Sequence, residues 1–151
     1  KIINGIILDL GSHVFDILNF LIKDLKLKKN KIFLRKLENK NSDYAQIISN
    51  DKIYTNIEMS YCSWKNTFKL EIIGSKGSIY VDNLCKWGNS SIKYHKRVFP
   101  SGRPKITSFK YKKGDPTWAR EHNFLRSKKD KFYTNIENEI KIYNLFRELK
   151  I

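Results

Sequence analysis

The chain has 151 residues and carries 30 Lys and Arg against 15 Asp and Glu, a formal net charge of +15 at pH 7. This length fits one domain and leaves no room for a complete two-domain enzyme. Apolar residues make up 40% of the sequence, which is enough for a hydrophobic core and argues against wholesale disorder. No apolar run approaches the roughly 20 residues that span a bilayer, so we expect no membrane segment.

The positive charge has two interpretations. Lys, Ile and Asn are abundant, whereas alanine occurs only as Ala45 and Ala119. That bias is typical of an AT-rich genome, and the lysines are spread along the chain. We therefore interpret the charge mainly as solvated lysine, with a polyanion-binding surface or an anionic small substrate as the functional alternatives.

The cysteine and methionine content bears on the cellular compartment of the protein and on whether the chain is part of a longer one. Cys62 and Cys85 are the only cysteines, and neither a CxxC pair nor a Cys/His cluster with zinc spacing occurs. We therefore expect no metal site, no disulfide framework and a cytoplasmic location. Met59 is the only methionine, so Lys1 is no translational start, and we expect the chain to be a piece of a longer protein.

The first element in the chain is a helix. Residues 6–22 are apolar on nearly every side at helical spacing, which predicts a mostly buried helix over about residues 10–23. Three polar residues, Asp9, His13 and Asp16, are spaced i, i+4 and i+7 and so share one helix face.

Period-two patterns follow and predict strands over residues 32–38, 44–49, 53–61, 68–72, 79–81, 91–99 and 106–112. The clearest local signal is the β-hairpin around Gly74-Ser75-Lys76-Gly77. A Pro- and Gly-containing segment over 100–104 separates the last two strands.

The end of the chain returns to helix. Asp115-Pro116 is a typical helix start, and Thr134 to Glu137 fits a capping box before a last helix. Because no β–α–β alternation occurs, we predict an α+β fold with an open, mainly antiparallel sheet of about six strands and helices packed on one face. We expect a single domain over residues 1–151.

Asp9 and His13 are the first candidates for catalytic residues. A carboxylate four residues before an imidazole can orient the ring and make it a base near neutral pH. The structural alternatives are that Asp9 is only a helix N-cap and His13 only a hydrogen-bonded buried histidine. For Asp16 we expect a structural role.

Four residues beside turn signals are candidates for substrate binding: Trp64, Lys65, Lys86 and Trp87. Trp118 at a helix start is expected in the core, and His95 on a solvated strand face. No GxGxxG or P-loop is present, so the sequence shows no phosphate-cradling loop and no cofactor-binding residue.

Residues 4–16, Asn-Gly-Ile-Ile-Leu-Asp-Leu-Gly-Ser-His-Val-Phe-Asp, resemble the Gly-Gly-x-x-x-Asp-x-Gly-x-His-x-x-Asp motif that opens the C-terminal domain of Gfo/Idh/MocA oxidoreductases. The hairpin over residues 70–79 is similar to a strand, Gly-x-x-Gly, strand feature of that family. The resemblance covers essentially the whole chain in element order. It departs from the motif at Asn4, where the family has glycine.

The resemblance implies a longer enzyme with an N-terminal Rossmann domain that binds NAD or NADP. It implies that His13 exchanges a proton with the substrate oxygen, that Asp9 binds substrate and tunes the histidine, and that the sheet forms a subunit interface. Neither the cofactor domain nor the family's Glu-Lys-Pro lysine occurs in this chain. By itself the chain is therefore expected to bind no dinucleotide and to be inactive.

The resulting hypothesis is the substrate-binding and oligomerisation domain of an NAD(P)-dependent dehydrogenase. Its substrate would carry a sugar, cyclitol or sugar-nucleotide hydroxyl, with hydride passing to nicotinamide. Expected partners are this small molecule and further copies of the chain, with no membrane and no nucleic acid. The alternatives are a non-catalytic dimerisation or scaffold domain and a basic nucleic-acid-binding module.

Overall fold

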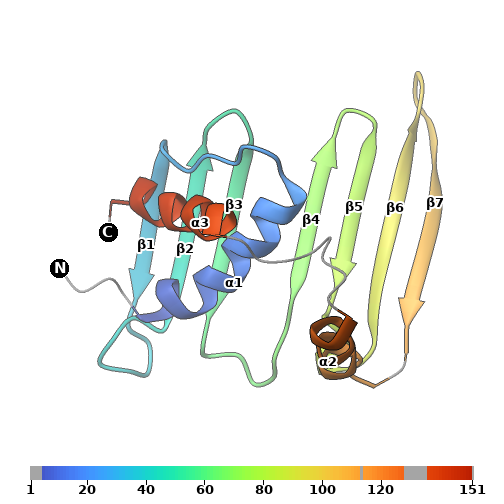
Figure 1. Cartoon of the computed structure of the whole chain (residues 1–151). Helices are drawn as coiled ribbons and strands as arrows, with labels where there is room; N and C mark the ends of the chain where they lie inside the picture. The colour runs from blue at the N-terminus through green and yellow to red at the C-terminus, as the bar shows by residue number, and fades with distance from the viewer. Residues whose placement is uncertain (1–4, 113, 128–135, 151) are drawn as a thin grey trace. The chain divides into compact units, whose positions relative to one another are not determined.

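The structure is a computed structural model that describes residues 5–112, 114–127 and 136–150 (Figure 1). The elements in order are α1 (Gly5–Leu21), β1 (Asn30–Arg35), β2 (Tyr44–Asn50), β3 (Tyr54–Ser60), β4 (Lys69–Gly74), β5 (Gly77–Asp82), a short 3-10 helix (Cys85–Trp87), β6 (Ser90–Val98), β7 (Gly102–Tyr111), α2 (Thr117–Ser127) and α3 (Ile136–Glu148). The predicted α+β class is confirmed. The described strands form two antiparallel sheets, of three and four strands.

The chain divides into two compact units. The first unit comprises Lys1–Ser63 with Phe132–Ile151, and the second comprises Trp64–Lys131. Each sheet lies wholly within one unit, and each unit is described by itself.

The sheet of the first unit has the order β1-β2-β3. Its period-two pattern places alternate residues of β2 and β3 on one buried face. The register pairs Ala45 with Met59 and Ile47 with both Ile57 and Ile32. These cross-strand pairs form the sheet side of the hydrophobic core.

Helices α1 and α3 both cover that face of the sheet, as Figure 1 shows, and each contacts the other. α1 contributes Ile6, Ile7, Phe15 and Leu18 to the core, and α3 contributes Ile142 and Leu145. The prediction of helices packed on one face is confirmed for this unit. The helix begins at Gly5, five residues earlier than expected, so it includes Asp9 within its second turn.

The second unit contains the sheet β4-β5-β6-β7. The predicted hairpin is confirmed, with Gly74 paired to Gly77 across a two-residue turn. Gly77 has a φ of +153°, and a Cβ there would lie 2.3 Å from the backbone oxygen of His95. Only glycine fits this position because β6 passes directly beside it.

The last strand differs from the prediction. β7 begins at Gly102 rather than near residue 106, and it includes Pro104. A proline is tolerated because β7 is the edge strand of this sheet and because the ladder is interrupted there, between Lys96 and Val98 of β6.

Helix α2 starts as expected. Oδ1 of Asp115 accepts hydrogen bonds from the backbone N–H of Thr117 at 2.9 Å and from its hydroxyl at 2.6 Å. The expectation that Trp118 belongs to the core is wrong, because 77% of its surface is exposed. Thr134 and Asn135 of the expected capping box lie outside the described residues.

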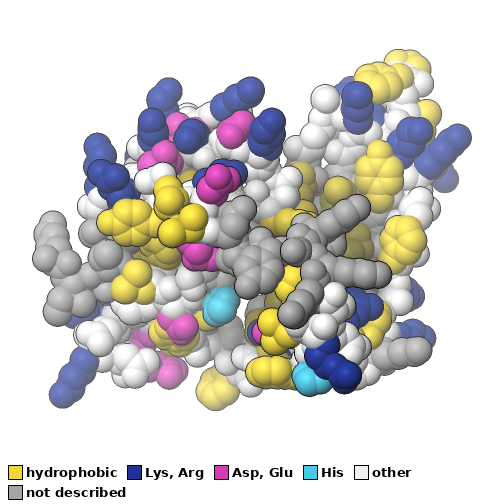
Figure 2. All heavy atoms as spheres, in the orientation of Figure 1, with side chains coloured by type: hydrophobic (Ala, Val, Ile, Leu, Met, Phe, Trp, Pro, Cys, Tyr) yellow, Lys and Arg dark blue, Asp and Glu magenta, His cyan; other side chains and the backbone are white. Residues whose placement is uncertain are grey.

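The two units differ in core and charge. No described residue of the second unit is buried, so the described core lies in the first. The sequence of the second unit has 17 Lys and Arg against 5 Asp and Glu, hence +12 of the total +15. In Figure 2, lysine and arginine side chains mix with apolar ones on the side of β6 and β7.

Candidate functional site

The outer face of α1 gathers the polar residues that the sequence singled out. Asp9, His13, Asp16 and Phe20 are all exposed and lie on the side of the helix opposite to its buried residues. Asp9 and His13 occupy consecutive turns, as their spacing predicts. The helix therefore presents a carboxylate and an imidazole to solvent on one face.

Both structural alternatives for this pair are wrong. Asp9 lies inside α1 and does not cap its start at Gly5. His13 is exposed and so is not a buried histidine of the core. The aspartate and the histidine are thus accessible to a ligand, which a catalytic role requires.

Asp9 has a partner that lies far away in the sequence. Oη of Tyr61 donates a hydrogen bond to Oδ2 of Asp9 at 2.7 Å. Tyr61 comes directly after the last residue of β3, and its own backbone N–H donates to the carbonyl of Asp43 at 2.9 Å. The side chain of Asp9 is therefore bonded to a tyrosine held at the end of the sheet.

Asp16 takes the structural role expected for it. Nδ2 of Asn138 donates to Oδ1 of Asp16 at 3.4 Å, and Nδ2 of Asn19 donates to Oδ1 of Asn138 at 2.6 Å. These amide contacts join α1 to the first turn of α3. Asp16 is therefore engaged in holding two helices together.

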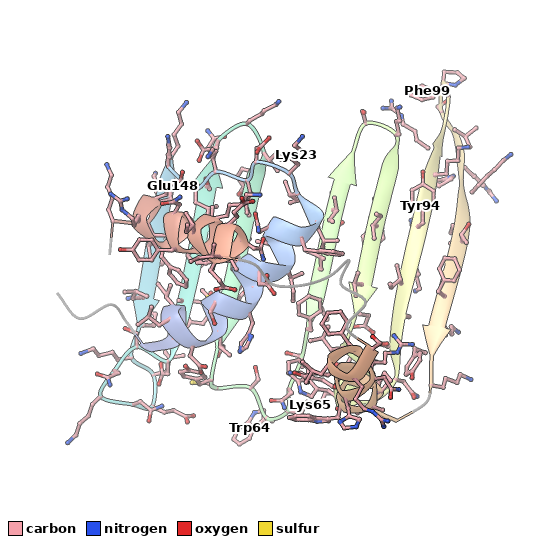
Figure 3. The ribbon with its side chains drawn as sticks, in the orientation of Figure 1. Lys23, Trp64, Lys65, Tyr94, Phe99 and Glu148 are labelled. Carbon is pink, nitrogen blue, oxygen red and sulfur yellow. The ribbon has the colours of Figure 1, made fainter. Side chains whose placement is uncertain are left out.

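The four substrate-side candidates all belong to the second unit. Trp64 and Lys65 lie on the connection before β4 and are exposed, and Trp64 projects away from the ribbon in Figure 3. Nζ of Lys86 lies 5.0 Å from the centre of the Trp87 ring, a cation–π contact. The structure thus brings Lys86 and Trp87 together.

Lys86 also acts on the start of α2. Its positive charge contributes to the lowered pKa of Asp115, after the hydrogen bonds from Thr117. Lys86, in the 3-10 helix, is therefore close enough to the N-terminus of α2 to affect the ionisation of Asp115.

A shallow hollow on one face of the four-stranded sheet contains none of these candidates. It is lined by Tyr80, Lys93, His95, Ile106 and Ser108. His95 is half-buried and packs against Tyr80, with ring centres 4.9 Å apart, so the expected solvated position is only partly realised.

Sequence reasoning missed Tyr61. The predicted strand over residues 53–61 includes Tyr61, but β3 ends at Ser60, and the hydroxyl of Tyr61 bonds to Asp9 on α1. A tyrosine immediately after a strand was the only available signal. Among the described residues, no cluster of His, Cys, Asp and Glu could hold a metal ion. None of the described helices is both long enough and apolar enough to cross a bilayer.

No protein-family model and no curated protein matches this sequence. Its fold is similar to the crystal structure of a "putative oxidoreductase" from Bacteroides fragilis NCTC 9343, with a TM-score of 0.61 at 16% sequence identity. The match covers 97% of this chain but 48% of that structure, so the chain spans about half of its length. The similarity establishes a shared fold over nearly the whole chain.

Proposed function

We propose that this chain is the substrate-binding and oligomerisation domain of an oxidoreductase that acts on a hydroxyl of a sugar, cyclitol or sugar nucleotide. The observation that carries the proposal is the exposed pair of Asp9 and His13 on consecutive turns of α1. The shared fold with the Bacteroides fragilis protein and the motif resemblance of residues 4–16 support it. The intact protein would be an enzyme of the cytoplasm.

The chain's own residues supply proton transfer and binding. The neutral imidazole of His13 accepts the proton of the substrate hydroxyl during oxidation and returns a proton to the oxygen during reduction. Asp9, next to it on the helix, stabilises the imidazolium that forms and accepts a hydrogen bond from a second hydroxyl of the substrate. For the second unit, the residues we propose for substrate binding are Trp64, Lys65, Lys86 and Trp87.

The hydride acceptor we propose is NAD or NADP. The described residues do not fit a dinucleotide by themselves, because all their strand pairings are antiparallel and no parallel β–α–β unit is formed. The cofactor would therefore be held mainly by a further domain of a longer protein.

The test uses the longer protein that contains this chain. Reduction of NAD and NADP is followed by absorbance with a panel of aldoses, cyclitols and sugar nucleotides. His13→Ala should lower kcat by about 100-fold or more, because general acid–base catalysis contributes factors of roughly this size. His122→Ala is the matched control, since His122 is also an exposed helical histidine, and it should stay within about twofold of the wild type. Wild-type turnover in His13→Ala would refute the assignment.

A second candidate function is a dimerisation or scaffold domain. The observation that favours it is a set of exposed apolar side chains on one face of the sheet β4-β5-β6-β7. The register places Val81, Ile92 and Phe109 side by side on that face, together with Ile72 and Ile79. Ile92 is 46% exposed and Phe109 64% exposed. Contiguous exposed apolar side chains are typical of protein interfaces.

Sedimentation equilibrium tests the association through this face. Ile92→Glu should shift the protein toward the monomer, whereas Lys93→Glu, which points to the opposite face of β6, should not. An unchanged mass in Ile92→Glu would exclude this surface. Association without any dehydrogenase activity in the longer protein would favour the scaffold over the enzyme.

The charge of the second unit favours a third candidate, the nucleic-acid-binding module. Lys96 and Lys105 are exposed and directly paired, and no acidic residue occurs from residue 83 to residue 114. Such a surface would bind an oligonucleotide with an affinity that falls steeply with salt. Failure to bind a mixed oligonucleotide at low salt would remove this candidate.

A further inference from the structure

The hydrogen bond between Tyr61 and Asp9 lies outside the motif of residues 4–16, because that motif does not include Tyr61. It joins residues 52 positions apart, one on the second turn of α1 and one at the end of β3. Both side chains are exposed, and 45% of the Tyr61 surface is accessible. At the surface a phenol can be fully hydrated, so core packing does not require a direct bond to a carboxylate here.

We propose that Tyr61 is a positioning residue of the Asp9/His13 site: its hydroxyl holds Oδ2 of Asp9, which leaves Oδ1 for the imidazole of His13 or for a substrate hydroxyl. This inference rests on the proposed function. A carboxylate has two oxygens and about four lone-pair sites, so one hydrogen bond fixes its orientation without exhausting its capacity. None of the described hydrogen bonds of the chain uses Oδ1 of Asp9.

Hydrogen bonds tie the backbone that carries Tyr61 to a buried residue. Its backbone N–H continues the ladder beyond the last β2–β3 pair, between Tyr44 and Ser60, by donating to the carbonyl of Asp43. Asp43 is fully buried, and its carboxylate accepts hydrogen bonds from the backbone N–H groups of Leu37, Glu38 and Asn39 at 2.7–2.9 Å. The phenol is therefore presented from a fixed backbone position, as precise positioning requires.

The hydroxyl of Tyr61 also remains a hydrogen-bond donor over the whole pH range in which a histidine changes its protonation state. Partial burial, followed by the hydrogen bond and the charge of Asp9, raises the pKa of Tyr61 to about 12. At neutral pH the hydroxyl is fully protonated, so Asp9 is held in the same way whether the imidazole is neutral or charged. The tyrosine therefore acts by orientation and takes no part in proton exchange.

The first experiment measures pH–rate profiles of the longer protein that contains this chain. Tyr61→Phe keeps the ring but removes the donor, so Asp9 can rotate. We expect kcat to fall about 10-fold or more, because small misplacements at a reacting centre cost rates of that order. We also expect the acidic limb of the kcat/KM profile to move, since a reoriented carboxylate stabilises the imidazolium differently.

Tyr54→Phe is the matched control, because Tyr54 lies at the other end of β3 and is 66% exposed. It should leave both the rate and the pH profile unchanged. If His13→Ala is inactive but Tyr61→Phe keeps the wild-type rate and pH profile, the positioning role is refuted while the proposed function stands. If His13→Ala is fully active, the proposed function itself fails.

A second measurement does not depend on activity. With ¹³C at the tyrosine Cζ, NMR titration of the 151-residue chain reports the pKa of Tyr61 directly. Asp9→Asn removes the charge that helps to raise this pKa, so the titration midpoint of Tyr61 should fall, while that of Tyr54 should not. An unchanged midpoint for Tyr61 would show that the bond is absent in solution and would overturn the inference.

Discussion

The ring of Phe15 on α1 meets the ring of Phe146 on α3 edge to face, with centres 4.9 Å apart and planes inclined by 71°. Phe15 is fully buried. Edge-to-face pairs contribute about 0.5–1.5 kcal/mol beyond the area they bury. This contact therefore fastens the C-terminal helix to the helix that carries the candidate site, and it links the two ends of the chain within the first unit.

Phe15→Ala should lower the free energy of unfolding by about 3–5 kcal/mol, because it removes a large buried ring and leaves a cavity. Urea unfolding followed by circular dichroism measures the change. Phe20→Ala on the same helix is the control, since Phe20 is 73% exposed, and it should change stability by less than about 0.5 kcal/mol. Equal losses in the two variants would contradict the core described above.

Gly77→Ala should open the β4–β5 hairpin, whereas Gly74→Ala should not. A methyl group at Gly77 would collide with the backbone of His95, while at Gly74 its nearest neighbour would be the backbone oxygen of Gly77, at an ordinary 3.7 Å. We expect a cost of about 1–3 kcal/mol for Gly77→Ala, as for other strained backbone positions. Amide hydrogen exchange of β5 measures it, and equal exchange rates in the two variants would refute the close approach.

Most of the fold could be predicted because its signals are local. The alternation of Ile57 and Met59 with polar neighbours defines β3, and Gly74 and Gly77 mark a hairpin. The N-terminal boundary of α1 was misplaced because Asp9, a typical N-cap residue, directly precedes residue 10, whereas the helix already includes Asp9. The start of β7 was missed since Pro104 is tolerated only on an edge strand, and strand order is not a local property.

The candidate site was predictable only in part. The spacing of Asp9 and His13 placed them on one helix face, and the structure bears this out. The bond from Tyr61 to Asp9 could not be predicted, because it depends on where β3 ends relative to α1. Contacts of this kind arise from tertiary packing and leave no periodic trace in the sequence.

Asp43 should make the protein sensitive to acid. Hydrogen bonds from the backbone N–H groups of Leu37 and Glu38, with a further one from Asn39, hold the pKa of Asp43 well below its usual range. A carboxyl whose pKa is lowered by folding stabilises the protein above its unfolded pKa, about 3.9, and loses this contribution as the pH falls toward the folded value. The free energy of unfolding should therefore decrease below about pH 4.

Asp43→Asn tests the origin of this acid sensitivity. The variant should be less stable at pH 7, because an amide offers one acceptor oxygen to donors that share two, and its stability should fall less steeply below pH 4. Asp24→Asn is the control, since Asp24 is exposed and the described hydrogen bonds do not include it. An unchanged acid slope in Asp43→Asn would assign the sensitivity to other carboxyls, such as Asp51, which accepts a hydrogen bond from the backbone of Lys29.

Replacing Lys105 should stabilise the sheet of the second unit. Lys105 is paired directly with Lys96 across β6 and β7, and like charges at such positions repel. Lys105→Gln removes the repulsion and Lys105→Glu replaces it with attraction, so we expect gains of about 0.2–1 kcal/mol that are larger for Glu. Hydrogen exchange of the β6 and β7 amides measures these gains, which should shrink at high salt because exposed charges are screened. Equal stability of all three proteins, or gains independent of salt, would show that the two lysines do not interact.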